Sequence, residues 1–200
     1  MISKEMIGGL SVLVGLAGFV PYFWAMYKRE VKPHVFTWFT WGLLAGLVFA
    51  AQWTEGGGAG AWNIGIIAFV CFLVAVLALF VGEKNITRKD WVTFVAALIA
   101  IPVWWLTDDP VGSVILATLI NFLAFLPTFF KSYHKPREES LGYYVFSTIG
   151  FVLSIWALEV YNLTTVLYPG YIVVANIAFA AMVLWRRRIL SAALSRSNIH

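Results

Sequence analysis

The sequence predicts an all-α membrane protein with seven transmembrane helices, and three features of the chain support this fold class. Of its 200 residues, 61% are hydrophobic and only 12% are charged, whereas soluble domains carry about 25% charged residues. Charge-free apolar runs recur at close to the length of about 20 residues that a helix needs to cross a bilayer. The basic residues gather between these runs, as membrane topology signals do.

Seven apolar runs give the expected spans. They cover residues 6–27, 35–54, 59–81, 91–107, 111–130, 141–158 and 170–185. The first run is longer than the apolar core of a signal peptide, which has about 7–15 residues, and it ends in the bulky Trp24, Met26 and Tyr27. We therefore interpret it as a retained helix.

The positions of Lys and Arg predict the orientation. Thirteen of the fourteen basic residues fall in connections on one side of the predicted membrane, and Lys4 is the fourteenth. Cytoplasmic loops carry an excess of Lys and Arg. We therefore expect the N-terminus outside and the C-terminus in the cytoplasm, in a plasma (inner) membrane, and an odd number of spans follows from this arrangement.

Several function classes are disfavoured by the residues that the spans lack. No Asp, Glu, His or Lys lies well inside a span, where a proton relay or ion site would need one. No Cys and His cluster has the spacing of metal ligands, and no nucleotide-binding loop is present. We expect no enzyme activity, no cofactor, no metal and no nucleic-acid partner; the expected partners are a small-molecule solute and the lipid bilayer, and homo-oligomer formation is left open.

The chain contains an internal repeat. A shift of 106 residues aligns F-V-P-Y-F at 19–23 with F-L-P-T-F at 125–129, so that Pro21 meets Pro127. Each copy precedes a short basic loop, and the two copies fall in the first and fifth predicted spans. This predicts a 3+1+3 arrangement of two parallel three-helix bundles, related by an axis along the membrane normal.

The repeat divides the chain into four parts. We expect a first three-helix repeat at 1–82, a linker with the fourth span at 83–110, a second repeat at 111–188 and a cytoplasmic tail at 189–200. Proline removes a helix hydrogen bond and kinks the helix. Because Pro21 and Pro127 lie at equal depth near the cytoplasmic side, we interpret them as paired hinges of an inner gate, with passive kinks as the alternative.

These features resemble the PQ-loop superfamily, which includes the SWEET and SemiSWEET sugar transporters and the nicotinamide riboside transporters. The resemblance rests on the 3+1+3 plan, the paired F-x-P-x-F motifs before basic loops, and E-S-L-G at 139–142. It covers most of the chain as architecture. The namesake Pro-Gln dipeptide is absent, since Tyr22 follows Pro21 and Thr128 follows Pro127. The resemblance implies transport of a small solute, and the superfamily also contains receptors that do not transport.

Three asparagines within spans are candidates for binding the solute. An amide in hydrocarbon must find a partner, so Asn63, Asn121 and Asn176 should face a neighbouring helix or a wet cavity. The resemblance to SWEET proteins implies that Asn63 in W-N-I-G and Asn176 in A-N-I-A hydrogen-bond a sugar. The alternative for all three is hydrogen bonding between helices.

Two tryptophans complete the predicted site. Trp38 and Trp41 are three residues apart, so they share one helix face, and indole rings can stack on a sugar or on a heteroaromatic ring. The alternative is an interfacial aromatic belt. Gln52, near the outer end of the same span, could line an outer vestibule.

Together these residues predict a facilitative, uncoupled transporter of a small uncharged polar solute that works by alternating access. A sugar is the first expectation for the solute, and a nucleoside-like vitamin is the second. A non-transporting membrane receptor or assembly protein of the same fold is the alternative from another class.

Overall fold

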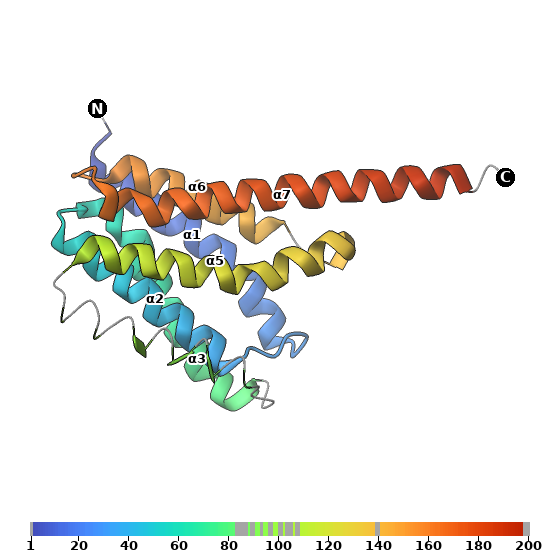
Figure 1. The fold of residues 1–200 in the computed structure, drawn as a ribbon, viewed down its shortest axis with the longest axis horizontal. Helices are drawn as coiled ribbons and strands as arrows, with labels where there is room; N and C mark the ends of the chain where they lie inside the picture. The colour runs from blue at the N-terminus through green and yellow to red at the C-terminus, as the bar shows by residue number, and fades with distance from the viewer. Residues whose placement is uncertain are drawn as a thin grey trace.

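The computed structural model describes residues 2–82, 109–138 and 141–197, together with a few separate positions between 88 and 106. Its regular elements are helices (Figure 1). They are α1 (Lys4–Tyr27), α2 (Val35–Thr54), η1 (Gly58–Ala61), α3 (Trp62–Val81), α5 (Pro110–His134), η2 (Pro136–Glu138), α6 (Gly142–Ala157) and α7 (Leu163–Ser197).

The described helices confirm an all-helical protein with segments that can cross a membrane. Five segments are long and apolar enough to do so, and they are α1, α2, Gly58–Val81, α5 and Leu163–Ser191. The sixth helix, α6, is apolar but has only 16 residues. The predicted fourth span, 91–107, falls largely outside the described residues, so the prediction of seven spans is not confirmed.

Side chains fix the starts of three helices at the end of the molecule where the N-terminus lies. Ser3, Asp109 and Asn162 each accept a hydrogen bond from the backbone N–H three residues further on. Such N-caps satisfy a donor that the first helical turn leaves unpaired. Pro110 follows Asp109 at the first helical position of α5, where its missing N–H costs nothing.

Helix α7 begins earlier and ends later than the sequence predicts. The expected span started at residue 170, yet Pro169 lies inside the helix. A proline cannot donate a hydrogen bond to the carbonyl four residues before it. Here that carbonyl belongs to Thr165, and it accepts a hydrogen bond of 2.9 Å from Gln52 Nε2 of α2. The neighbouring helix thus satisfies the freed group, as a bilayer requires. Helix α7 also continues through Ser197, well into the predicted tail.

The six long helices that the structure describes form two groups of three that contact each other along two seams. Helix α3 packs against both α1 and α2, and α7 packs against both α5 and α6. Two seams, α1–α6 and α2–α5, join the resulting groups of three. The contacts are therefore symmetric: α5, α6 and α7 take the places in the second group that α1, α2 and α3 take in the first. In Figure 1, α1 and α5 both run from the left end of the molecule to the right end, so these two equivalent helices have the same direction.

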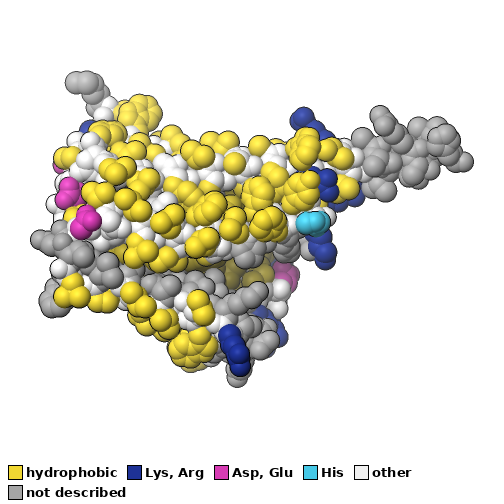
Figure 2. All heavy atoms as spheres, viewed as in Figure 1, with side chains coloured by type: hydrophobic (Ala, Val, Ile, Leu, Met, Phe, Trp, Pro, Cys, Tyr) yellow, Lys and Arg dark blue, Asp and Glu magenta, His cyan; other side chains and the backbone are white. Residues whose placement is uncertain are grey.

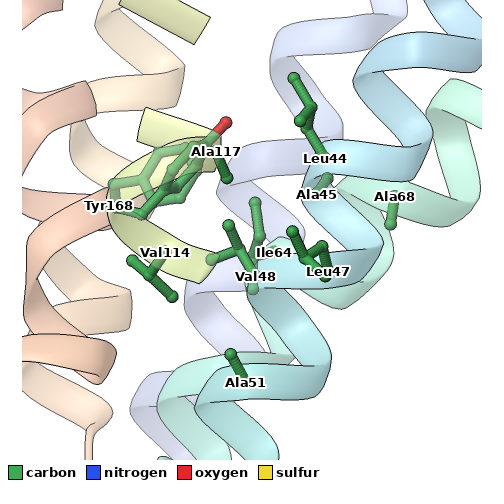
Figure 3. Close-up of a cluster of buried hydrophobic side chains, with 11 residues drawn as sticks. Leu44, Ala45, Leu47, Val48, Ala51, Ile64, Ala68, Val114, Ala117 and Tyr168 are labelled. Carbon is green, nitrogen blue, oxygen red and sulfur yellow. The ribbon is translucent and has the colours of Figure 1, made fainter. Parts of the chain in front are cut away.

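An apolar cluster joins the two groups close to the starts of α5 and α7, which lie at the left end of the molecule in Figure 1. Leu44 and Val48 of α2 pack with Val114 and Ala117 of α5 and with Tyr168 of α7 (Figure 3). Each of these side chains is at most 5% exposed. The groups are therefore tightly joined at this end.

Charged side chains separate toward the two ends of the molecule. On the face drawn in Figure 2, most Lys and Arg residues gather toward the right end, whereas Asp and Glu lie at the left end and also beside the basic residues at the right. Hydrophobic side chains cover the length between the two ends. This distribution suits helices that cross a membrane. We label the left end the outer end and the right end the inner end, after the orientation that the sequence predicts.

Candidate functional site

An aromatic layer lies in the inner half of the described helices. It consists of Phe19, Tyr22, Trp38, Phe125, Tyr143, Tyr144 and Phe179. Phe19 of α1 lies 6.3 Å from the Trp38 ring of α2 and 5.5 Å from the Tyr143 ring of α6, between ring centroids. Phe19 therefore contacts helices of both groups.

The second group contributes the other side of this layer. The Tyr144 ring of α6 lies 4.5 Å from Phe179 of α7, and Phe125 of α5 lies 5.2 Å from Phe179. Tyr143 and Tyr144 are 5.6 Å apart and connect the two sides. The layer thus runs through α1, α2, α5, α6 and α7.

The layer follows the internal repeat. The shift of 106 residues takes Phe19 to Phe125 and Trp38 to Tyr144. Both pairs have ring centroids 6.3 Å apart, with interplanar angles of 55° and 51°. Two sequence-equivalent pairs therefore share one geometry. Phe19 is 3% and Trp38 8% exposed, so the first pair faces the interior of the helix assembly.

Trp38 and Trp41 share a helix face as predicted, but only one of them is buried. Their rings meet edge to face at 5.3 Å. Trp38 also donates from Nε1 to the Tyr22 hydroxyl at 3.0 Å. Trp41 is 37% exposed, against 8% for Trp38. Trp38 therefore belongs to the interior layer, and Trp41 lies at its margin.

Asn176 lies beside the aromatic layer, in the interior. Its side chain is 7% exposed and donates from Nδ2 to Ser147 Oγ of α6 at 3.1 Å. Ser147 and Tyr143 are one turn apart, on the same face of α6. The structure thus places an amide and a hydroxyl next to the rings of the layer.

Asn121 is engaged by two tyrosines of α7. Its Nδ2 donates to the Tyr168 hydroxyl at 3.2 Å, and its Oδ1 accepts from the Tyr171 hydroxyl at 3.2 Å. Both ends of the amide are therefore used to join α5 to α7. This contact fits the predicted alternative of hydrogen bonding between helices.

Asn63 is the most enclosed of the three asparagines. It has 0% exposure, and neither Nδ2 nor Oδ1 has a hydrogen-bond partner. Its amide packs against glycines of two other helices: a Cβ added to Gly15 would lie 2.5 Å from Oδ1, and one added to Gly150 would lie 3.4 Å from Nδ2. Asn63 therefore occupies the junction of α1, α3 and α6.

The predicted hinge prolines fall inside helices. Pro21 lies within α1 and is exposed, beside a surface hollow that it lines with Val20, Phe23 and Trp24. Pro127 falls within α5, but its side chain lies outside the described part of the structure. Figure 1 shows that α1 and α5 each change direction in their second halves. The assignment of these prolines to a gate stays a prediction.

At the outer end, hydrogen bonds join the two groups of helices. Gln52 donates to the Thr165 carbonyl at 2.9 Å, and it is 1% exposed rather than lining an open vestibule as predicted. Four more bonds cross between the groups here, from Lys4 Nζ to Leu158 O, Ser154 Oγ to Gly60 O, Asn162 Nδ2 to Glu55 Oε2, and Glu159 N to Gly57 O. The outer end is therefore closed by polar contacts as well as by the apolar cluster.

At the inner end, several hydrogen bonds connect helices of the same group. Arg186 of α7 donates to the Tyr133 carbonyl of α5 at 2.9 Å and also lies over the Tyr133 ring. Arg137 donates to Ser191 Oγ at 3.0 Å. Figure 1 shows α2 and α5 close together at the outer end and diverging toward the inner end. The two ends of the molecule are thus joined differently.

Several residues of this region were not among the predicted site residues. Phe19 and Phe125 open the two copies of the F-x-P motif, so the repeat carried a signal for them. Tyr144 and Ser147 are the repeat equivalents of Trp38 and Trp41, which was a second signal. Phe179 has Leu73 as its repeat equivalent, so nothing in the repeat pointed to it.

No protein-family model matches the chain, and comparison with curated proteins and with solved structures finds no match. Its function is therefore inferred from the residues and contacts described above.

Proposed function

We propose that the chain is a facilitative carrier of a small uncharged polar solute, built from two like-oriented three-helix repeats that move against each other. The observation that carries this proposal is the difference between the two ends. The outer end is held shut by hydrogen bonds between the repeats, whereas inner-end bonds of Arg137 and Arg186 stay within one repeat. Such a molecule can exchange solute with the inner side while it is sealed on the outer side.

The repeats are the natural moving bodies. The packing of α3 between α1 and α2 is repeated by α7 between α5 and α6. The equivalent ring pairs Phe19–Trp38 and Phe125–Tyr144 support the same division. Rigid bodies related by an axis along the membrane normal suit alternating access around a site between them. This arrangement agrees with the resemblance to the PQ-loop superfamily.

The chemistry of the interior favours an uncharged polar solute. Among the described residues, the buried polar side chains are all Ser, Thr, Gln or Asn. A charged solute would lose its hydration without gaining a countercharge. Aromatic faces in the layer can stack on the apolar face of a sugar or on a heteroaromatic ring, while Asn176 and Ser147 supply donors and acceptors. A sugar is the first candidate and a nucleoside-like vitamin the second.

The orientation in the membrane is part of the proposal. Arg186, Arg187 and Arg188 follow the apolar part of α7, and Lys28 and Arg29 follow α1 at the same end. An excess of basic residues marks the cytoplasmic side. The closed outer end then faces away from the cytoplasm, in a plasma (inner) membrane.

Solute flux into proteoliposomes tests this function. We expect saturable uptake of a labelled sugar or nucleoside down its own gradient, unchanged by an imposed pH gradient. Trp38→Ala should abolish most of the uptake, because it removes the ring that Phe19, Tyr22 and Trp41 contact. Trp156→Ala is the matched control, since Trp156 is 65% exposed on α6 and its loss should leave uptake unchanged.

Two outcomes would overturn the proposal in different ways. Uptake that strictly requires the pH gradient would contradict an uncoupled carrier. Saturable binding of a solute without any flux would instead favour a membrane receptor of the same fold, the alternative that the sequence leaves open.

A further inference from the structure

The connection between α2 and α3 is buried inside the outer end instead of lying on the surface. We call residues 56–61 the outer plug. Within it, Gly57, Ala59, Gly60 and Ala61 are buried, and η1 contacts α1, α2, α3 and α6. Connecting segments normally run over the protein surface. A turn that four helices surround therefore needs a reason for its position.

Glycines allow the outer plug to fit where it does. Gly56 and Gly58 have φ values of 74° and 56°, which side chains rarely permit. A Cβ added to Gly60 would lie 2.5 Å from Leu158 Cδ2 and 2.8 Å from Leu158 Cα. The plug is thus fitted against the chain that follows α6, with no room for a methyl group at Gly60.

The outer plug belongs to the first repeat, but the second repeat holds it in place. Ser154 Oγ of α6 donates to Gly60 O at 2.6 Å, and Glu159 N donates to Gly57 O at 3.3 Å. Separation of the repeats at the outer end must break both bonds. The plug therefore changes its contacts when that end opens.

Asn63 lies in the first turn of α3, two residues after the outer plug, and its environment opposes this closed arrangement. The side chain is fully buried and both amide atoms lack partners, whereas the amides of Asn121 and Asn176 are hydrogen-bonded. A buried polar group without a partner forfeits the hydrogen bonds that water gave it. Packing Gly150 of α6 against this amide in the closed arrangement is therefore less favourable than packing it against an apolar side chain.

We propose that the outer plug is the outer gate and that the unpaired amide of Asn63 sets how readily this gate opens. The inference deepens the proposed carrier function, on which it rests. When α6 separates from the plug it also separates from Asn63, and the amide then gains hydrogen bonds from water. Asn63 thus acts through the gate in the closed conformation, without contact to a bound solute.

Accessibility of a cysteine in the outer plug tests the gate. The full chain with Cys71→Ala and Ala61→Cys is placed in sealed proteoliposomes, and a membrane-impermeant maleimide is added outside. Asn63→Val removes the amide without adding bulk, and it should slow labelling by about fivefold or more and raise the Tm. Gly60→Ala should accelerate labelling by about fivefold or more, because its methyl group displaces the plug from Leu158.

Matched variants separate these effects from general damage. Asn176→Val removes a paired amide, so it should lower the Tm, in contrast to Asn63→Val. Gly9→Ala places a methyl group where nothing lies within 4 Å, so it should leave labelling unchanged. If Asn63→Val does not yield folded protein, Asn63→Ala provides the same test with a smaller side chain.

If Asn63→Val accelerates labelling or leaves it unchanged, the proposed role of Asn63 is wrong. If Gly60→Ala leaves labelling unchanged, the outer plug is not the gate. Neither readout requires transport. If both variants change labelling as expected but the protein carries no solute flux, the carrier function is refuted and the gate stands. If the protein carries flux but neither variant changes labelling, the gate is refuted and the carrier function stands.

Discussion

The Thr165 carbonyl shows how a single side chain permits a proline inside a membrane helix. Pro169 leaves this oxygen without its helical donor, and Gln52 of the other repeat supplies one at 2.9 Å. The bond also joins α2 to α7 at the closed outer end. We therefore assign Gln52 a double role, in the integrity of α7 and in the contact between the repeats.

This assignment predicts a thermodynamic coupling between Gln52 and Pro169. Gln52→Leu should lower the free energy of unfolding by about 1–3 kcal/mol, because it leaves a buried carbonyl unpaired. In a Pro169→Ala background the same change should cost less, since the substituted alanine would donate its own backbone N–H to the Thr165 carbonyl. Unfolding of the four proteins in the same detergent measures the coupling, and an equal loss in both backgrounds would refute it.

Asn176 and Ser147 allow a second prediction, about solute affinity. If this pair contacts the solute, Asn176→Leu should weaken binding by about tenfold or more, because a site built for a hydrogen bond then loses a partner. Ser147→Ala should weaken it less, and the double variant should fall short of the product of the two effects. Equilibrium binding of the transported solute provides the measurement. Unchanged affinity in Asn176→Leu would remove this residue from the site.

The sequence identified polar residues better than it identified their partners. Asn63 and Asn176 are buried as an amide in an apolar span should be, and Asn121 is engaged by its neighbours. What each amide meets depends on packing between distant helices. That is why the two tyrosines on Asn121 and the glycines beside Asn63 could not be inferred from the residues near them in the chain.

Helix α1 shows how small residues determine which helices meet closely. Gly8, Ser11, Gly15 and Gly18 recur at helical spacing and are all buried. Gly8 faces the plug, where an added Cβ would lie 2.7 Å from Ala59 O, and Gly18 faces Phe146 of α6. This face lets α1 approach α6 and the plug at backbone distance.

Two adjacent glycines of α1 give a third prediction. Gly8→Ala should destabilise the protein, because its methyl group meets the Ala59 backbone, which cannot move as a flexible side chain can. Gly9→Ala, one residue away and facing open space, should stabilise it by about 0.5–1 kcal/mol through helix propensity. Thermal unfolding of both variants in nanodiscs checks this. The opposite order of stabilities would contradict the packing of α1.

Helix ends were harder to predict than helix positions. The predicted spans 6–27, 35–54 and 111–130 match α1, α2 and much of α5. Helix α7 differs most, because Asn162 caps it before Pro169 and Gln52 repairs the break that Pro169 makes. Such a repair comes from a helix more than 100 residues away in the chain, so the residues around Pro169 give no sign of it.

At the level of the molecule, the internal repeat did not predict the difference between the α1–α6 and α2–α5 seams. The α1–α6 seam has Gly8 and Ser11 where the α2–α5 seam has their repeat equivalents Val114 and Ala117. The larger pair lies in the apolar cluster at the outer end. Toward the inner end α2 and α5 diverge (Figure 1). A weak repeat signal cannot reveal such an asymmetry, because it arises from how unequal side chains pack.

Paired spin-label distances across the α2–α5 seam test directly whether the two repeats move as rigid bodies. In a Cys71→Ala background, one label pair at Thr54 and Val111 reports the outer end, and a second pair at Thr37 and Thr128 reports the inner end. Gly60→Ala should lengthen the outer distance and shorten the inner one, because displacing the outer plug shifts the population toward the outward-open arrangement. An outer distance that changes while the inner distance stays the same would contradict alternating access.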